Sequence, residues 1–444
     1  MIADRFWSMS TAANAVARRP LVSDERTQAT PLLVTPALVG FYFCFRTAIT
    51  LIAVRLLVLE SQTGAVAGLV LDFGLLLVVA FQAIGRSERS LRWMLKSSSF
   101  RWVLAYLAFA LCSLAWSGTV SLPTSFFYWC GIAADVAIVV LMLRTAPVDG
   151  VVHSLMKGYI WSACLLALVA WIMPVEADLR LGDMDYFNTN QIGNLCAFGI
   201  LLAQYLMSRK DGKWGAEITF LAITLVRSLS KSTLAAFVLS EGILLFRDKT
   251  VSRRVKLLIA TAALIVGASF WSLYENYYDV YTNAGNQAET LTGRTAIWAF
   301  ALDAALTKPW FGNGFDALWK VMPPFGSDQF EARHAENEVL QQFFAYGVVG
   351  IALLVGVYGS FYKRIKRLPD QPMKLILTTL FLFIVIRGLT EAEPFDLLLP
   401  LWAITLIGAS VETRIRGGQE GATNGVSLSA QLSGFSGTAR SSIQ

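Results

Sequence analysis

The stretch EARHAENEVLQQFFAYGVVG, residues 331–350, joins a charged segment to an apolar run and holds one of the chain's two histidines, His334. An imidazole can accept or deliver a proton near neutral pH, so His334 is a candidate general base or orienting group. If a helix begins near His334, Glu336 points away, and one polar stripe at helical spacing contains His334, Asn337, Glu338 and Gln341. Spacing alone leaves open whether this corner is catalytic or structural.

Other ionisable residues lie in or beside long apolar runs, where an unpaired charge is costly and a functional role is the default hypothesis. With the topology given below, six such residues fall in the outer half or at the outer rim, namely Arg55, Asp72, Arg227, Lys231, Arg387 and Glu391. The long loop before the tenth predicted span adds Arg294, His334, Glu336 and Glu338 above them. Asp135 and Glu241 are expected nearer the inner side. An arginine-rich outward cavity suits phosphate or pyrophosphate, because guanidinium forks match their oxygens. The alternative is that each charge snorkels or is structural.

The elements that must position these residues are membrane-spanning helices. The chain has 444 residues, of which 55% are hydrophobic and only 15% charged. The apolar residues fall in runs of roughly 17–25, the length that crosses a bilayer as a helix. We predict an all-α polytopic membrane protein with about twelve spans, near 36–59, 66–85, 102–117, 121–143, 152–173, 189–207, 214–227, 231–246, 255–272, 338–361, 373–390 and 396–411.

Lys and Arg concentrate in alternate short loops, such as RSERSLRWMLKSSSFR and RDKTVSRRVK, which predicts cytoplasmic placement of those loops and of both termini. The predicted organisation is a cytoplasmic tail at 1–30, nine spans within 31–272, an outward periplasmic loop at 273–337, three spans within 338–411 and a disordered cytoplasmic tail at 412–444. The net charge of +6 is therefore a topology signal and implies no nucleic-acid partner. Five cysteines within apolar runs fit small buried side chains better than metal ligands or disulfides.

The outward loop contains TGRTAIWAFALDAALTKP, which predicts an amphipathic helix along the outer membrane surface, with Thr292 as N-cap and Pro309 just past its end. Its apolar stripe consists of Ile297, Trp298, Ala301, Leu302 and Ala305. The following WFGNGFDALW has glycines for a tight turn and aromatic residues suited to the headgroup level.

Four stretches, in order, resemble the O-antigen ligase and polysaccharide polymerase superfamily, which includes lipopolysaccharide O-antigen ligases and Wzy- and ExoQ-type polymerases. They are DYFNTNQIGNLCAFGILL, RSLSKSTLAAFVLS, TGRTAIWAFALDAALTKPWFGNGFDALW and HAENEVLQQFFAYGVVG. They are similar to the family patterns NxNxxG, SxSR/KxxxLA, GRxxxW…PxxGxGxxxfW and HxxxLQxxxxxGxxG. The resemblance covers about residues 180 to 410, and the first five spans match in hydropathy only.

The resemblance implies inverting glycosyl transfer without a metal or other cofactor, on the outer face of the bacterial inner membrane. The implied donor is a glycan on undecaprenyl pyrophosphate. Lys231 or Arg227, together with Arg294, match the family's phosphate-gripping positions, and we add Arg387, Asn337 and Glu338 as expected substrate-binding residues. The family often has HN directly before the last-loop helix, where this chain has Glu336–Asn337, with His334 two residues earlier. Either His334 or Glu336 is then the base, or the chain has lost the activity.

The leading hypothesis is a polymerase that joins lipid-linked repeat units of exopolysaccharide or O-antigen. The alternative is an O-antigen ligase that moves finished glycan onto lipid A-core or another acceptor. A transporter or flippase of lipid-linked glycan is a third hypothesis, but the two halves of the chain show no internal repeat. The implied partners are the lipid-linked glycan, the bilayer, and chain-length regulator or export proteins.

Overall fold

The computed structural model describes residues 34–84, 90, 92–174, 179–183, 185–247, 252–254, 256–257, 291–324 and 331–417, and the single positions 261, 265, 268 and 271. Within these residues the secondary structure is helical apart from one isolated bridge between Asp183 and Phe187, which confirms the all-α prediction. The predicted tail at 1–30, residues 418–444 of the tail predicted at 412–444, and most of the predicted span at 255–272 lie outside the described residues, whereas residues 412–417 are helical and not part of a disordered tail.

Seven helical stretches in the described part of the chain are long and apolar enough to cross a membrane, and each matches a predicted span. Six of them are α4 (Ser61–Ile84), α6 (Ser98–Ser113, extended to Trp116), α7 (Leu122–Thr145), α8 (Val148–Ile172), α9 (Thr189–Ser208) and α16 (Glu338–Lys366). The remaining one, Pro36–Leu56, combines α2 (Pro36–Phe45) with three short turns that include α3 (Ile49–Leu51).

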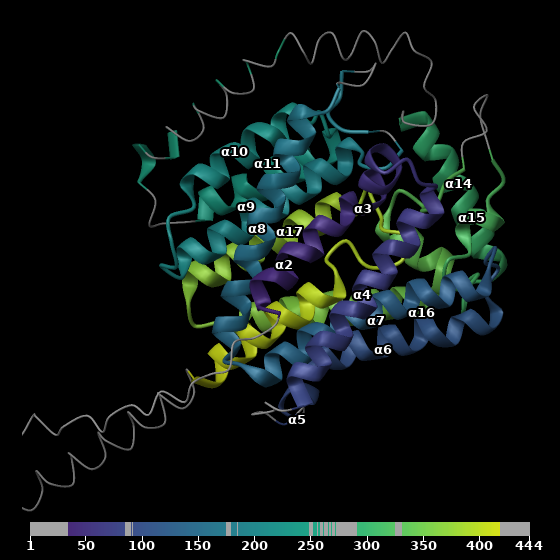
Figure 1. The fold of residues 1–444 in the computed structure, drawn as a ribbon, viewed down its shortest axis with the longest axis horizontal. Coiled ribbons are helices and arrows are strands. Elements are labelled where there is room, and N and C mark those ends of the chain that lie inside the picture. Colours follow the sequence, from purple (N-terminus) through teal and green to yellow (C-terminus); the bar gives the residue numbers. More distant parts are fainter. Residues whose placement is uncertain are drawn as a thin grey trace, which may run out of the picture. The chain divides into compact units, whose positions relative to one another are not determined.

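Four other predicted spans correspond to shorter helices, namely α10 (Gly215–Arg227), α11 (Lys231–Arg247), α17 (Gln371–Arg387) and residues 401–417. A total of twelve membrane crossings therefore stays a prediction. Figure 1 shows α2 beside α8 and α4 beside α7, and α6 also packs on α16. Gly40 and Gly158 let the backbones of α2 and α8 approach so closely that a Cβ at either position would overlap the facing backbone.

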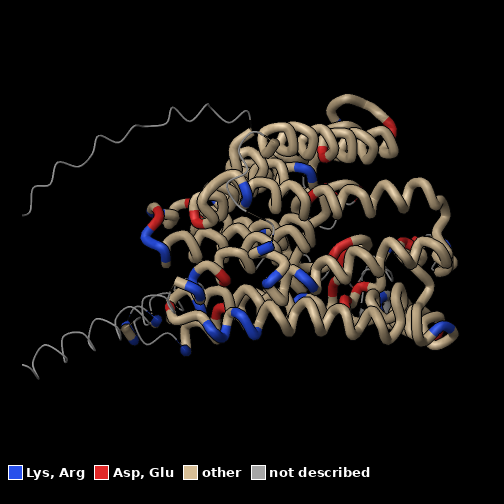
Figure 2. The backbone as a smooth tube through the Cα atoms, turned by 90° about the horizontal axis from the view of Figure 1, so that it is seen from below, with Lys and Arg blue, Asp and Glu red and all other residues tan. Residues whose placement is uncertain are grey.

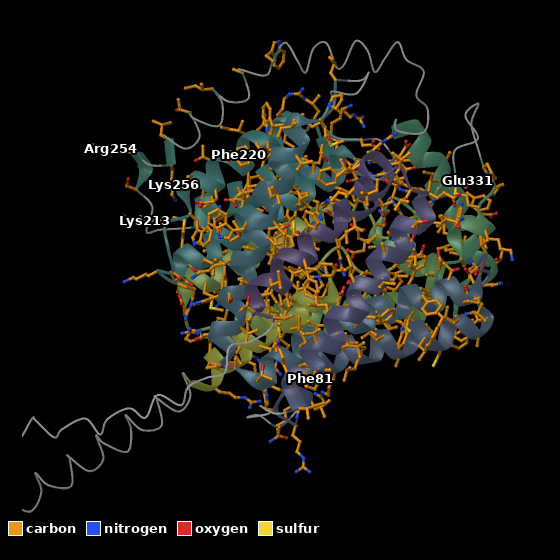
Figure 3. All side chains as sticks on the ribbon, in the orientation of Figure 1. Phe81, Lys213, Phe220, Arg254, Lys256 and Glu331 are labelled. Carbon is orange, nitrogen blue, oxygen red and sulfur yellow. The ribbon has the colours of Figure 1, made fainter. Side chains whose placement is uncertain are left out.

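The spans differ in how far the protein covers them. Only 17% of the most apolar window of α4 is buried, against 72% for α9. Phe81 of α4 is 72% exposed and lies at the periphery of the ribbon, as does Lys213 after α9 (Figure 3). The exposed apolar side chains of α4 are what a lipid-facing helix requires, whereas α9 is an interior helix.

The first span is irregular where Arg46 interrupts it, as a 3-10 turn occupies Arg46–Ala48. The guanidinium of Arg46 lies 2.6 Å from Asp135 of α7 and 3.6 Å from Asp72 of α4. The expectation that Asp72 is in the outer half and Asp135 nearer the inner side is therefore wrong, because one side chain contacts both. Each carboxylate lies near the middle of a 24-residue helix, so the two share one depth.

Cationic ends of several helices meet at one end of the bundle. Arg414 lies 2.6 Å and Arg209 3.6 Å from Asp149 at the start of α8, and Arg364 at the end of α16 pairs with Glu412. Figure 2 shows Lys and Arg gathered more densely toward this end. The charge pattern predicts that this end is cytoplasmic, and the orientation stays a prediction.

Beyond the opposite end lie α14 (Leu291–Thr307) and the short α15 (Leu318–Val321). The α14 helix starts one residue before the predicted N-cap Thr292 and ends before Pro309 as predicted. Three residues of its predicted stripe are buried in a small core with Phe344 of α16, namely Ile297, Ala301 and Ala305, whereas Leu302 is exposed. The stripe therefore packs on protein.

A backbone interlock fixes α14 and the loop that follows it to α16. The helix is broken at Gly347, whose φ of 64° is left-handed, and the loop that follows α14 docks onto the break. The N–H groups of Asn313 and Gly314 donate to Phe344 and Ala345, at 2.9 and 2.8 Å, and the Val348 N–H donates to Pro309 at 2.8 Å. The GNG glycines predicted to make a tight turn thus allow close backbone contact with α16.

Candidate functional site

The end of the bundle opposite the cationic helix ends brings together side chains from four separate parts of the chain. Arg294 comes from the first turns of α14, Glu336 from the loop before α16, and Arg387 from the last residue of α17. The fourth part is residues 388–400, a non-helical connection that carries Glu391. Because α14 is anchored on α16 and α17 ends beside the start of α16, these side chains converge although they are distant in sequence.

Arg294 bridges two carboxylates. Its Nη2 donates to Glu391 Oε1 at 3.0 Å, and its Nε lies 3.3 Å from Glu336 Oε2. The two contacts are not equivalent, because Glu336 Oε2 is buried and receives no hydrogen bond from the described residues. Arg294 is thus firmly held by Glu391 and only electrostatically paired with Glu336.

His334 and Glu336 lie next to each other, and both are partly buried. His334 Nδ1 lies 3.6 Å from Glu336 Oε1 and accepts a long hydrogen bond of 3.4 Å from the Glu336 backbone N–H. Glu336 has a left-handed φ of 50°, uncommon for a residue with a side chain, and its carbonyl accepts from Trp298 Nε1 of α14 at 3.2 Å. The two candidate bases therefore face the same cluster.

The predicted polar helix stripe does not form, because α16 begins at Glu338 with Asn337 as its N-cap. His334 lies before the helix, and Glu336 turns toward it rather than away. Burial raises the pKa of the Glu336 carboxyl above its usual value, and the neighbouring Glu391 adds to the rise, while His334 and Arg294 oppose it. A raised pKa suits a group that accepts a proton.

Asn337 and Glu338, both expected to bind substrate, make contacts that hold the scaffold. Asn337 Nδ2 donates to the Leu389 carbonyl at 2.9 Å, and its Oδ1 accepts from the Leu340 N–H. Glu338 is 3% exposed and its Oε1 accepts from the Tyr358 hydroxyl at 2.6 Å and from the Leu398 N–H at 2.9 Å. Both side chains tie the start of α16 to residues 388–400.

Arg387 is the most buried arginine of the cluster, at 3% exposure. Its Nε donates to Thr233 Oγ1 of α11 at 3.4 Å, and its Nη2 lies 4.0 Å from Glu391 Oε2. Its Nη1 is buried and donates to none of the described residues. A buried guanidinium nitrogen without an acceptor is costly, so this nitrogen is a ready partner for an anionic ligand.

The start of α11 also faces this cluster. Ser232 Oγ donates at 3.0 Å to Glu391 Oε1, the carboxylate oxygen that holds Arg294. The exposed Lys231 directly precedes Ser232 in the chain. The first turn of a helix presents unpaired N–H groups and the positive end of the helix dipole. The Nη1 of Arg227 donates to the Leu179 carbonyl at 3.0 Å, in a different segment of the chain.

The position of α11 is set by α9, which explains why two of the family-like stretches occur together. Ser230 Oγ donates to Asn190 Oδ1 at 2.8 Å, and Thr189 donates to the Ser228 carbonyl. Gly193 lies against Ser230 so closely that a Cβ there would be 2.9 Å from the serine Cβ. These contacts fix the break between α10 and α11 and thereby the place of Lys231.

Sequence reasoning missed Glu391 as the centre of the cluster, although it noted the charge at the outer rim. The available signal was its spacing of four residues after Arg387 at the end of a span, which allows an ion pair. Within the described part of the chain, no three His, Cys, Asp or Glu side chains are grouped so that they could hold a metal ion.

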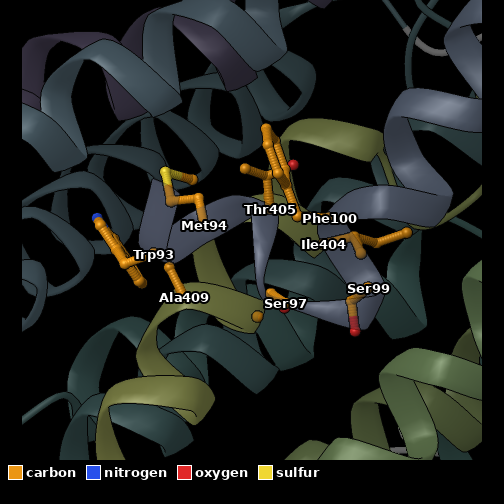
Figure 4. Close-up of a pocket in the computed structure, with 9 residues that line it drawn as sticks. Trp93, Met94, Ser97, Ser99, Phe100, Ile404, Thr405 and Ala409 are labelled. Atoms are coloured by element: carbon orange, nitrogen blue, oxygen red, sulfur yellow. The ribbon is translucent and has the colours of Figure 1, made fainter. Parts of the chain in front are cut away.

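A separate small pocket lies between α5 (Arg92–Leu95), the start of α6 and residues 401–417 (Figure 4). Its lining is apolar apart from a few hydroxyl groups, as Trp93, Met94, Ile404 and Thr405 illustrate, and includes no charged side chain. Its lining has no cation to pair with a phosphate, whereas the arginine cluster has two.

Comparison with known proteins agrees with the resemblance. Residues 218–355 match the family model described as O-antigen ligase, a range that includes three of the four family-like stretches. The chain is 24% identical over 327 residues to the exopolysaccharide production protein ExoQ of Rhizobium meliloti, an alignment that covers 67% of this chain and 73% of that protein. It is 31% identical over 142 residues to an O-antigen ligase of Pseudomonas aeruginosa, which covers 32% of this chain and 33% of that protein. The resemblance is thereby confirmed.

Proposed function

We propose that this chain, a polysaccharide-biosynthesis membrane protein with an O-antigen ligase family domain at residues 218–355, polymerises lipid-linked repeat units. The donor is a glycan on undecaprenyl pyrophosphate, and the reaction takes place on the outer face of the bacterial inner membrane. The similarity to the exopolysaccharide production protein, which extends over 67% of the chain, favours a polymerase of the exopolysaccharide type.

One observation carries the proposal: the buried Arg387 Nη1 has no acceptor among the described residues, and Arg294 converges with Arg387 on Glu391. The guanidinium groups of Arg294 and Arg387 lie beside the start of α11 and provide donors that match pyrophosphate oxygens. As the glycosidic bond breaks, negative charge grows on the pyrophosphate. Donors already in place there lower the barrier without a metal ion or other cofactor.

The base lies beside this grip. The acceptor hydroxyl attacks the anomeric carbon of the donor and loses its proton to Glu336 or His334. The bond from that carbon to the phosphate oxygen breaks, and its electron pair leaves on undecaprenyl pyrophosphate. A single displacement of this kind inverts the anomeric configuration. The carboxylate and the imidazole are 3.6 Å apart, so either of them can serve while the other orients it.

The test is a reconstituted assay with purified protein in vesicles, supplied with lipid-linked repeat units. The proposal predicts a ladder of longer glycans that remain on undecaprenyl pyrophosphate, with loss of the ladder in Arg294→Ala and Arg387→Ala. Arg414→Ala is the matched control, because this arginine is also ion-paired but at the opposite end of the bundle. A normal ladder from both cluster variants contradicts the proposal.

The second candidate is a ligase, and the similarity to the Pseudomonas O-antigen ligase over 142 residues favours it. The same assay separates the two functions when a lipid A-core acceptor is added. Transfer of preformed glycan to that acceptor, without lengthening of the donor glycan, identifies a ligase. Movement of intact donor across the vesicle membrane without a new glycosidic bond identifies a flippase.

A further inference from the structure

We infer that Glu391 is a positioning residue that holds one end of the Arg294 guanidinium, so that the donor pyrophosphate draws the other end from Glu336 and frees that carboxylate to act as the base. The inference rests on the proposed function and adds to it a link between donor binding and activation of the acceptor. It also gives Glu391 a role, although the residue belongs to neither the phosphate grip nor the pair of candidate bases.

The two carboxylate contacts of Arg294 are unequal. Glu391 Oε1 accepts a hydrogen bond of 3.0 Å from Nη2, whereas Nε approaches Glu336 Oε2 at 3.3 Å and leaves that oxygen without a hydrogen bond from the described residues. Of the two carboxylates, Glu336 is therefore the one that an incoming anion displaces at lower cost.

Glu391 is itself fixed. It is 4% exposed, and the oxygen that accepts from Arg294 also accepts from Ser232 at 3.0 Å. Its other oxygen faces Arg387 at 4.0 Å. The carboxylate thus joins α14, α11 and the end of α17, and it keeps Arg294 beside Arg387, where the pyrophosphate is proposed to bind.

Glu336 lies among charged groups. The groups that face it are His334 from its own loop, Arg294 from α14, Arg387 from α17 and Glu391 from residues 388–400. Burial already raises the pKa of Glu336, with Glu391 raising it further and the cations opposing. A pyrophosphate that takes Arg294 removes a nearby positive charge and adds negative ones, so Glu336 binds a proton more tightly once the donor is present.

The acceptor O–H bond breaks, and its proton goes to a carboxylate oxygen of Glu336. The acceptor oxygen bonds to the anomeric carbon. The bond from that carbon to the phosphate oxygen breaks, and its electron pair stays on the pyrophosphate. Before a donor is bound, Glu336 stays paired with Arg294 and is not free to act as the base.

The experiment follows Glu336 directly. Infrared difference spectra are recorded when undecaprenyl pyrophosphate is added to protein in vesicles of phosphatidylethanolamine and phosphatidylglycerol. In the wild type, binding should produce a difference band of the ionised Glu336 carboxylate, because its ion pair with Arg294 is lost, and this band should be absent from Glu336→Gln. In Glu391→Ala, the Arg294 guanidinium pairs fully with Glu336. We expect a weakened band per bound lipid and an affinity reduced about ten- to a hundredfold.

Glu391→Gln keeps an oxygen for Arg294 and Ser232, and it should restore part of the signal. Glu412→Gln, which removes a similarly buried acid at the opposite end, should leave the signal intact. A purely structural role for Glu391 would lower the amount of folded protein but not the band per bound lipid, so an unchanged band in Glu391→Ala overturns the inference. If lipid binds to the wild type without changing the carboxylate bands of Glu336, only this inference fails. If the wild type does not bind the lipid, the proposed function fails with it.

Discussion

Glu338 offers a test that separates a scaffold from a substrate contact. Its Oε1 alone accepts both hydrogen bonds, from the Tyr358 hydroxyl and from the Leu398 N–H, at a site that is 3% exposed. Glu338→Ala leaves two buried donors without an acceptor. Each unsatisfied donor costs about 1–3 kcal/mol, so the variant should lose about 2–6 kcal/mol of folding free energy.

Glu338→Gln is the matched variant, because its amide oxygen can take the place of Oε1 and accept from both donors. It should remain within about 1 kcal/mol of the wild type, since only the added strength of a charged acceptor is lost. Thermal unfolding in detergent measures the stability, and the vesicle assay measures polymer formed per folded protein.

The geometry predicts that stability and polymer yield change together in Glu338→Ala and that neither changes much in Glu338→Gln. A different pattern would refute the reasoning. If Glu338→Gln unfolds at the wild-type temperature but loses nearly all activity, the carboxylate contacts substrate, and its contacts with Tyr358 and Leu398 are not its main role.

Three further predictions concern the base, the interlock and the grip. Because the pKa of Glu336 is raised above 4.5, activity should fall as the pH drops through that raised value. In pH–rate profiles, Glu336→Gln should remove this acid limb and His334→Ala should keep it. The reverse result assigns the base to His334. The raised pKa also means that this group favours the folded state most at low pH, and that the contribution is lost as the pH rises through the folded pKa. Gly347→Ala places a side chain at a φ of 64° and should lower the unfolding temperature by the equivalent of at least about 1–2 kcal/mol. Gly359→Ala, in open space on the same helix, should not lower it. Equal unfolding temperatures in the two variants would rule out the interlock. Lys231→Ala should abolish polymer formation while the protein still inserts, and polymer of normal length would remove Lys231 from the grip.

Hydropathy was sufficient to find the helices, because a span must bury its own backbone hydrogen bonds and therefore shows a long apolar run. It was weaker for α10 and α11, which are 13 and 17 residues long and separated by a break at Leu229, where φ is 61°. Depth was the least predictable property, as Asp72 and Asp135 show. Their shared level depends on how α4 and α7 pack around Arg46, which no single run encodes.

The residues of the site were found in part. Charge within or near apolar runs was enough to select Arg294, Glu336 and Arg387, because such charges need a partner or a function. Glu391 became the centre only through a contact with Arg294 across 97 residues, which depends on the docking of α14 onto the broken α16. The stripe proposed for His334 failed because Asn337 caps the helix after the histidine.

The central claim is that Arg294 and Arg387 grip the pyrophosphate of the donor. The most direct measurement is equilibrium binding of undecaprenyl pyrophosphate to the purified protein in vesicles, compared between the wild type, the Arg294→Ala/Arg387→Ala double variant and the Arg414→Ala control. Loss of two charge-assisted contacts predicts affinity at least about a hundredfold weaker in the double variant and unchanged in the control. Equal affinity in all three proteins would contradict the account.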